Sequence, residues 1–337
     1  MDFDENGQSV LFLSCDLTGS TRYKQSQILK LQKPSAEKDA NPWQKAFLQF
    51  YHEFPQILSD ERGSLKSKYA SCPDFELWKP VGDELIFSCV VRSELQIRDA
   101  IRVWIAAMDK YETSCLDDTP ALGTKGGAFV ATFPEPDSRS SIPKNMNAPG
   151  SKRDADVLII NKEAVAQADE KNYLFDYFGP SIDTGFRITS KCSDRYFTLS
   201  VEAALGLLQA ETDPKDVELI GMELLKGVWN GREYPLVAID RQSKDSVNIH
   251  LRPFRQAQNA QSLKSLCYAC YGSDGWPSKL FLPESDDLNY REELTDPLKS
   301  SYLASESKDG AEDLPEEVEV PRDGVADNFP TSRPSSS

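Results

Sequence analysis

Apolar positions along the chain follow two different periods, which predicts a protein that mixes helices and strands. Residues 9–15, SVLFLSC, form an apolar run that stops abruptly at Asp16, as expected for a buried strand that delivers an acid to its end. Large apolar residues recur at helical spacing over 41–58 and again over 94–112. Further strand-like runs cover residues 75–80, 84–91, 126–133, 196–201, 217–229 and 233–239.

The order of these elements predicts the fold class. Strand, helix, strand, strand, helix and strand follow one another before further elements, which is the ferredoxin-like pattern of an α+β sandwich with a central, mostly antiparallel sheet. Residues 175–192 are predicted to run from a strand or turn into a helix, and 202–210 to form another helix. Residues 22–40 are expected to be a loop or frayed helix, and 134–154 a surface insertion.

Three parts of the chain differ in composition. Residues 1–240 carry the regular pattern and are predicted to form the main domain. Residues 241–290 keep their aromatic side chains and are expected to pack on the core or on a partner. Residues 291–337 are acidic, rich in Ser and Pro and poor in apolar residues, so they are predicted to be disordered.

The charge and cysteine content limit the possible partners and compartment. A formal net charge of -16 argues against nucleic acid and anionic membranes as partners. The acidic N-terminus lacks the pattern of a signal peptide, and no apolar run is long enough to span a membrane. Seven scattered cysteines favour a reduced, cytoplasmic protein. Cys267 and Cys270 form an isolated CxxC, but the chain has only two histidines, which disfavours structural zinc.

Two acids and a polar turn suggest phosphate chemistry. Asp16 ends a buried strand, and Asp83 lies in the hairpin expected next to it, in LWKPVGDELIF. Paired carboxylates repel each other unless a cation lies between them, and Mg²⁺ prefers one or two carboxylates together with substrate phosphates. The turn LTGSTR after Asp16 opens toward a helix, so the backbone N–H groups of residues 18–21 could bind a triphosphate.

Three segments carry a resemblance to a known family. FLSCDLTGST, KPVGDELIF and DYFGPSIDTGFR resemble, in this order, the signature segments of class III nucleotidyl cyclases, and the resemblance covers roughly residues 9 to 240. It implies a cyclase catalytic domain over 1–240 and the following roles. The metal ligands are Asp16 and Asp83, the base-binding residues are Lys79 and Asp176, the transition-state residues are Asp183 and Arg187, and the triphosphate-binding residues are Thr18, Gly19, Ser20, Thr21 and Lys226.

The resemblance also implies a cofactor and an assembly. Two divalent metal ions, Mn²⁺ or Mg²⁺, would serve ring closure of a nucleoside triphosphate to a cyclic monophosphate and pyrophosphate. Lys79 and Asp83 lie on opposite sides of one turn, and in the family they serve two different sites. One catalytic domain therefore implies a head-to-tail homodimer with two shared sites. Asp183 departs from the family, which usually has Asn there, and this puts the ribose contact in doubt.

The base is less well determined than the reaction. Lys79 donates and Asp176 accepts, which suits adenine, cytosine and uracil and disfavours guanine. Tyr51 stands where many cyclases have Phe, and a bulkier ring there could restrict the pocket to a pyrimidine. WQKAFLQFYHEFP, WKPVGDELIF, GGAFVATFP and GPSIDTGFR resemble the pyrimidine cyclases of the bacterial Pycsar anti-phage system. That implies UTP as the favoured substrate, cyclic UMP as product and a separate effector; cytidylate and adenylate cyclases are the alternatives.

Other classes of function fit parts of the same pattern. VGDELIF is similar to the GGDEF hairpin of diguanylate cyclases, although the first glycine is missing and that family needs no Lys79, Asp176 or Arg187. A pseudocyclase that binds nucleotide without turnover is a second alternative, to which only Asp183 points. In a third, the acidic C-terminal part is the working element and the cyclase fold is its scaffold.

Overall fold

The computed structural model describes residues 7–31, 43–116, 121–145, 156–242, 259–292 and 294–298. The chain divides into two compact units, residues 1–297 and residues 298–337. Nearly all of the second unit lies outside the described residues, and so does the predicted disordered tail from 299 onward. The architecture below is that of the first unit.

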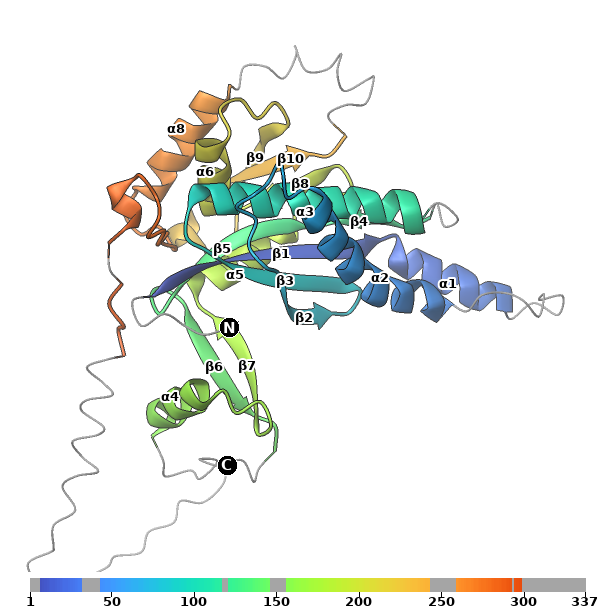
Figure 1. Ribbon diagram of the computed structural model, residues 1–337, viewed down its shortest axis with the longest axis horizontal. Coiled ribbons are helices and arrows are strands. Elements are labelled where there is room, and N and C mark those ends of the chain that lie inside the picture. Colours follow the sequence, from blue (N-terminus) through green and yellow to red (C-terminus); the bar gives the residue numbers. More distant parts are fainter. Residues whose placement is uncertain are drawn as a thin grey trace, which may run out of the picture. The chain divides into compact units, whose positions relative to one another are not determined.

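An eight-stranded sheet forms the centre of the part that the structure describes (Figure 1). Its strands are β1 (Gln8–Thr18), β2 (Glu76–Val81), β3 (Glu84–Val91), β4 (Gly123–Lys125), β5 (Gly127–Phe133), β8 (Tyr196–Leu199), β9 (Val217–Leu224) and β10 (Glu233–Asp240). They are ordered β2-β3-β1-β5-β8-β10-β9, and β4 pairs with β1 beyond the end of β5. Each pairing is antiparallel except that of β5 with β8.

The predicted ferredoxin-like α+β core is confirmed by this topology. The first, second, third and fourth strands of the predicted pattern are β1, β2, β3 and β5, and they lie in the sheet order second, third, first, fourth. Helix α2 (Trp43–Ser64) connects β1 to β2, and α3 (Glu94–Cys115) connects β3 to β5. Such crossovers place the hairpin β2–β3 beside β1, which matters for the site because Asp16 and Asp83 lie on these strands and their turn.

Side chains of β1 alternate between two hydrophobic cores, as a pleated strand requires. Leu11 and Leu13 belong to the larger core, which includes buried residues of α2, α3 and α6 (Val201–Ala210). Val10 and Phe12 belong to a smaller core with α5 (Pro180–Thr189). Because both faces are covered, β1 reads as a continuous apolar run, and its first eight residues are buried.

The region expected to be a surface insertion contains regular structure. Residues 138–143 form β6 (Ser138–Pro143), which pairs antiparallel with β7 (Tyr173–Phe178) in a separate two-stranded sheet, and α4 (Val157–Gln167) packs against it (Figure 1). The sequence of β6, SRSSIP, does not alternate between apolar and polar residues, so hydrophobic periodicity could not predict this strand. The expected frayed helix is α1 (Ser20–Leu31); residues 32–42 lie outside the described residues.

The C-terminal extension packs against the sheet and helices. Helix α8 (Ala260–Tyr271) contributes Leu263 and Cys267 to the larger core. The segment after it is pinned by hydrogen bonds: the Phe281 N–H donates to Ser9 Oγ at 2.8 Å, and Thr132 Oγ1 donates to the Lys279 carbonyl at 2.8 Å. These contacts lie at the end of β1 opposite to Asp16, so the extension supports the fold away from the acids.

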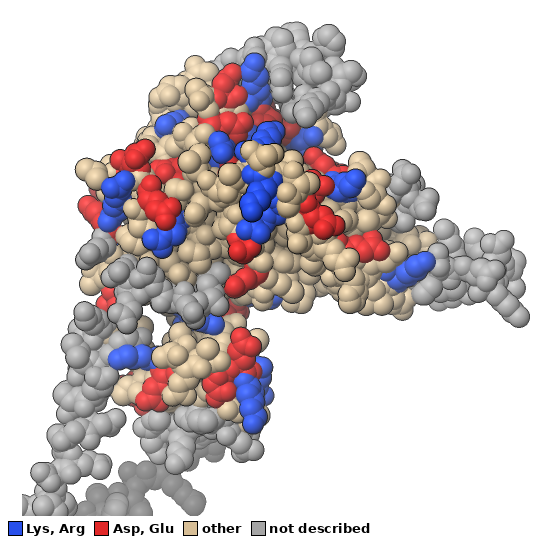
Figure 2. Space-filling model, viewed as in Figure 1, with Lys and Arg blue, Asp and Glu red and all other residues tan. Residues whose placement is uncertain are grey.

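Charged side chains of both signs are interspersed on the face shown in Figure 2, without a continuous basic area among the residues drawn there in colour. None of the helices in the described ranges combines the length and the apolar character needed to cross a bilayer. The seven cysteines all lie within described segments and are free thiols.

We expect the extension to contribute to the stability of the main domain. Leu282 is fully buried in the larger core, so Leu282→Ala should lower the free energy of unfolding by about 2–5 kcal/mol, measured by urea denaturation. Leu288 in the same extension is 72% exposed, and Leu288→Ala should change it by less than about 0.5 kcal/mol. Equal effects of the two substitutions would contradict the packing described here.

Candidate active site

The hairpin between β2 and β3 presents Asp83 beside the end of β1. Gly82 has φ of +65°, which the turn requires and which glycine adopts without strain. The Leu17 N–H donates to the Asp83 carbonyl at 3.3 Å, and the Tyr51 hydroxyl donates to the Gly82 carbonyl. The hairpin is thus tied to β1 on one side and to α2 on the other, which holds Asp83 next to Asp16.

Asp16 lies between two charged neighbours in the sheet. It is opposite Glu84 on β3 and opposite Lys125 on β4, so all three side chains point to the same face. Asp16 and Asp83 line an open cavity of about 630 Å³ together with Lys125 and the turn after β1. The structure therefore brings the two predicted metal-binding acids together.

The turn after β1 leads directly into the first turn of α1. Gly19 has φ of +73°, and a Cβ there would lie 2.2 Å from the Ala121 carbonyl oxygen, so only glycine fits. Thr18, Gly19, Ser20 and Thr21 all line the same cavity as the two acids. The first N–H groups of a helix have no intrahelical acceptors, so this end of α1 presents donors and a positive dipole to the cavity.

Lysines neutralise the acids in this cavity. Lys125 Nζ lies 3.1 Å from Asp16 Oδ2, and Lys24 Nζ lies 3.8 Å from Asp83 Oδ1. Burial raises the pKa of Asp16, the hydrogen bond from Lys125 opposes that shift, and the charge of Asp83 adds to it. Burial also raises the pKa of Glu84. The site thus concentrates negative charge where water is partly excluded, and it favours bound cations.

The two acids fit a divalent metal ion whose remaining ligands are waters and phosphate oxygens. No group of three or more His, Cys, Asp or Glu side chains suited to holding a metal occurs in the described segments. Asp16 and Asp83 supply two carboxylates, and Mg²⁺ commonly takes one or two carboxylates, several waters and substrate phosphates. The lysine at each acid shows that a positive charge is accommodated there.

A second group of predicted residues meets between β2 and β7. Lys79 Nζ donates to both carboxylate oxygens of Asp176, at 2.8 and 2.9 Å. The Trp78 Nε1–H also donates to Asp176 Oδ1, at 3.0 Å, and the ammonium of Lys79 lies 4.0 Å from the centre of the Trp78 ring. Trp78 thus holds both members of the pair, the acid by a hydrogen bond and the lysine by a cation–π contact.

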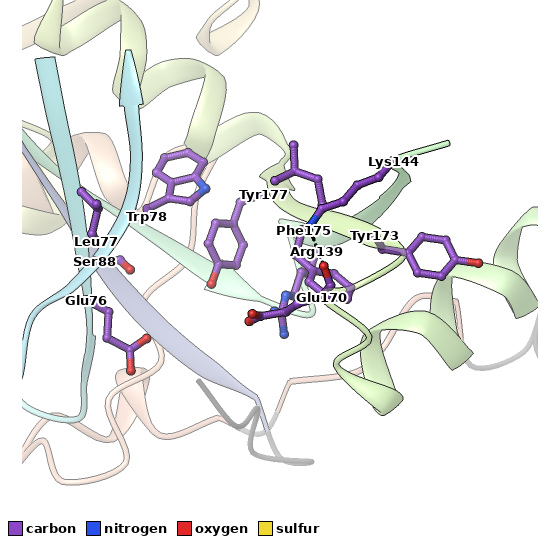
Figure 3. Close-up of a pocket in the computed structure, with 11 residues that line it drawn as sticks. Glu76, Leu77, Trp78, Ser88, Arg139, Lys144, Glu170, Tyr173, Phe175 and Tyr177 are labelled. Carbon is purple, nitrogen blue, oxygen red and sulfur yellow. Dashed lines mark hydrogen bonds between the residues drawn. The ribbon is translucent and has the colours of Figure 1, made fainter. Parts of the chain in front are cut away.

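Aromatic side chains form the floor beneath this pair. Trp78 packs on Phe12, Tyr177 and Phe186, with ring centres 4.8, 5.4 and 5.9 Å apart. Figure 3 shows Trp78 and Tyr177 facing each other from β2 and β7, beside a cavity of about 260 Å³ that extends along the two-stranded sheet β6–β7. None of the predicted site residues lines that cavity, which is bordered by Trp78 and Tyr177.

Helix α5 carries Asp183 and Arg187 one turn apart. Its N-terminus is held by the buried Asp137, which accepts from the N–H groups of Ser181 and Ile182 at 2.9 and 3.4 Å. Arg187 Nε is buried and has no acceptor among the residues described, and Asp183 is exposed. A buried N–H donor without an acceptor costs free energy, so Arg187 Nε lacks a partner that would stabilise it.

The predicted residues therefore fall into separate groups within one chain. Asp16 and Asp83 share one cavity with the turn at residues 18–21. Lys79 pairs with Asp176 outside that cavity. The Tyr51 hydroxyl contacts the turn of the β2–β3 hairpin at Gly82, next to Asp83. It is therefore close to the metal-binding acids and does not belong to the Lys79–Asp176 group. Lys226 is exposed on the turn after β9 and lines neither cavity.

Four residues in these groups were not predicted from the sequence: Trp78, Glu84, Lys24 and Lys125. Lys125 stands opposite Asp16 only because of the register between β4 and β1, which periodicity does not reveal. Trp78 lies at a register shift in β2, so its side chain leaves the regular alternation.

No protein-family model matches this chain, and no curated protein is similar to it in sequence. Solved structures similar to it include the adenylyl cyclase CyaB from P. aeruginosa (12% identity, TM-score 0.43), with 69% of this chain and 94% of that one covered. Others are the guanylate cyclase domain of RhGC from Catenaria anguillulae in complex with GTP (12%, 0.41; 69% and 97%) and the guanylyl cyclase Cya2 (12%, 0.40; 71% and 93%). At these TM-scores the similarity does not identify a function.

Asp137 should give the protein a distinctive pH dependence. Burial raises its pKa from 3.8 to about 6, so the folded state binds the proton more tightly than the unfolded state. Its contribution to stability is therefore present below about pH 4 and is lost as the pH rises through about 6. In urea denaturation between pH 4 and 7, Asp137→Asn should lack this component, and the exposed Asp213→Asn should keep it. Identical profiles for the wild type and Asp137→Asn would rule it out.

Proposed function

We propose that the chain is a class III nucleotidyl cyclase that converts a pyrimidine nucleoside triphosphate, with UTP favoured, to the 3′,5′-cyclic monophosphate and pyrophosphate. One observation carries this proposal: a cavity that combines two aspartates with the N-terminus of α1. Acids for metal ions and N–H groups for phosphates in one cavity are what a metal-assisted phosphoryl transfer needs. On this proposal residues 1–240 are the catalytic domain and 241–290 an extension of it.

Separation of the two groups of residues supports a homodimer with shared sites. Lys79 and Asp176 bind each other in the same chain that holds Asp16 and Asp83 in a different cavity. A head-to-tail pair would join the acid cavity of one protomer to the Lys79 group of the other, and would do so twice. In this arrangement Tyr51 lies on the acid side, where it meets the base held by the partner.

The chain's own residues would position the substrate for ring closure. Two divalent ions, Mg²⁺ or Mn²⁺, when held by Asp16 and Asp83, would acidify the ribose 3′-hydroxyl and neutralise the leaving pyrophosphate. The N–H groups of residues 18–21 and Lys226 bind the triphosphate. Arg187 donates to the oxygens of the α-phosphate while the bond to pyrophosphate breaks. Asp183, when ionised, can only accept, so it binds a ribose hydroxyl as an acceptor.

Base recognition would use the Lys79–Asp176 pair. The two groups now satisfy each other, so a base must replace part of that ion pair with one acceptor and one donor. Trp78 keeps Asp176 oriented when Lys79 turns to the base. Uracil, cytosine and adenine all present such an edge; the resemblance to the Pycsar cyclases favours uracil, with cytosine as the first alternative and adenine as the second.

The same resemblance supports a role in antiviral defence. The cyclic nucleotide would act as a second messenger on a separate effector protein, and the cyclase would work in the cytoplasm. A pseudocyclase is disfavoured because the sequence retains Asp16, Asp83 and Arg187, and the two aspartates line one cavity. A diguanylate cyclase would have no use for the Lys79–Asp176 pair.

Product analysis tests the proposal. The purified protein, given ATP, GTP, CTP and UTP together with Mn²⁺, should release cyclic UMP, detected by mass spectrometry. Asp83→Ala should lower the rate by about a hundredfold or more, because it removes a metal ligand. Asp213 also lies 3.8 Å from a lysine but is 70% exposed, and Asp213→Ala should retain the wild-type rate.

Each outcome of this assay decides a different part of the proposal. Release of cyclic CMP or cyclic AMP would show that the site accepts cytosine or adenine instead of uracil. It would not change the roles assigned to the site residues. Wild-type activity in Asp83→Ala would remove the metal assignment. No cyclic product from the wild-type protein would favour the pseudocyclase.

Mixing of two inactive variants tests whether the sites are shared. Asp83→Ala and Arg187→Ala each damage a different half of the site. Random exchange of subunits makes half of the dimers mixed, and each mixed dimer has one intact site, so about a quarter of the wild-type activity should return. Lys79→Ala should complement Asp83→Ala in the same way. If native mass spectrometry detects mixed dimers but activity stays at zero, the sites are not shared head to tail.

A further inference from the structure

Arg241, the residue that follows β10, is a buried cation outside the two cavities described above. Its side chain is only 3% exposed, and it lines neither the acid cavity nor the cavity beside Trp78. The Arg241 N–H donates to the Arg195 carbonyl at 2.9 Å, which fixes the point from which the side chain extends. A charge that is taken out of water needs partners inside the protein. The partners of the guanidinium therefore show which elements it connects.

The guanidinium joins helix α3 to the short strand β4. Arg241 Nη1 donates to the Thr124 carbonyl at 2.7 Å. Its Nη2 donates to Asp109 Oδ1 at 2.8 Å and lies 3.1 Å from Glu112 Oε1. Burial lowers the pKa of Arg241, but the charges of Glu112 and Asp109 outweigh this and raise it. The guanidinium therefore stays charged and ties β4 to α3.

Glu112 holds the same strand a second time. Its Oε1 accepts from the Thr124 N–H at 2.7 Å and from the Thr124 hydroxyl at 2.5 Å. Strand β4 has three residues, and among the described strands it pairs with β1. So short a ladder fixes a strand weakly, because it contributes few hydrogen bonds. The bonds from Arg241 and Glu112 thus supply much of what holds β4 in place.

The strand held in this way lies beside the acid cavity. In the register of β4 with β1, Lys125 stands opposite Asp16, and Gly123 stands opposite Thr18. A Cβ at Gly123 would lie 2.9 Å from Thr18 Oγ1, so the two strands are in close contact at the first residue of the turn. Asp16 and Thr18 both line the acid cavity. A shift of β4 would therefore disturb the first acid and the turn together.

We propose that Arg241 and Glu112 are positioning residues for the acid cavity: they fix β4, and β4 fixes Asp16 and the turn that begins at Thr18. This inference rests on the proposed function where it concerns binding of phosphates. Neither side chain lines the cavity, so each acts through β4. Because Arg241 is the first residue of the segment predicted as an extension, the catalytic unit then reaches at least one residue beyond β10.

Hydrogen–deuterium exchange tests the positioning without any reaction. In Arg241→Met the amides of residues 16–21 and 123–125 should exchange about tenfold faster than in the wild type, because β4 separates from β1 more often. Arg102→Met is the matched control. Arg102 is another arginine with little exposure, 11%, that pairs with two acids, but its partners lie on the far side of α6 and β9 from β4, and its substitution should leave those amides unchanged.

Two substitutions of Glu112 separate position from charge. Glu112→Gln keeps an oxygen that accepts from Thr124 and loses the negative charge, whereas Glu112→Ala loses both. Calorimetry with Mn²⁺ and inorganic tripolyphosphate, a probe without a base, should give Glu112→Gln an affinity within about threefold of the wild type. Glu112→Ala and Arg241→Met should each bind the probe about tenfold more weakly. A purely electrostatic effect would instead move Glu112→Gln and Arg241→Met in opposite directions, and that result would overturn the inference.

The exchange experiment separates this inference from the proposed function. Unchanged exchange at residues 16–21 in Arg241→Met, or an equal increase there in Arg102→Met, would overturn the positioning role. If Arg241→Met does not fold, exchange in Glu112→Ala decides in the same way. A wild-type protein that fails to bind the probe, or that releases no cyclic product, would contradict the proposed function and leave the exchange result standing.

Discussion

Repulsion between carboxylates is the constraint around which this fold is arranged. Asp16 and Asp83 come from distant parts of the sequence and meet in a partly buried cavity, with Glu84 opposite Asp16. Such an arrangement costs free energy unless cations are present. The structure supplies them with Lys125 and Lys24, one beside each aspartate. The protein can therefore fold around its acids without a bound metal ion.

Much of the fold follows from local patterns in the sequence. The buried strand that ends at Asp16, the hairpin around Gly82 and the amphipathic helices α2 and α3 are each visible in fewer than 25 residues. Their order then leaves the ferredoxin-like core as the expected arrangement. Strand β6 was missed because its sequence, SRSSIP, does not alternate between apolar and polar residues and it pairs with only one neighbour, β7. Such a strand has no buried face to impose a period of two.

Less of the site could be predicted, for a different reason. Asp16, Asp83, Lys79 and Asp176 stand in recognisable segments, but their partners are determined by register and by a bulge. Lys125 reaches Asp16 through the pairing of β4 with β1, and Trp78 reaches Asp176 from an irregular position in β2. A sequence pattern identifies the groups that do chemistry more readily than those that keep them in place.

The two ends of strand β1 have different roles: one end contacts the C-terminal extension and the other carries Asp16. At one end Ser9 and the extension form a hydrogen-bonded junction, and at the other Asp16 faces the cavity, roughly 23 Å away along an extended strand. The chain enters the sheet at Gly7, which is at the junction end. A reporter domain joined on that side would be attached far from the acids, so it would leave the mouth of the cavity uncovered.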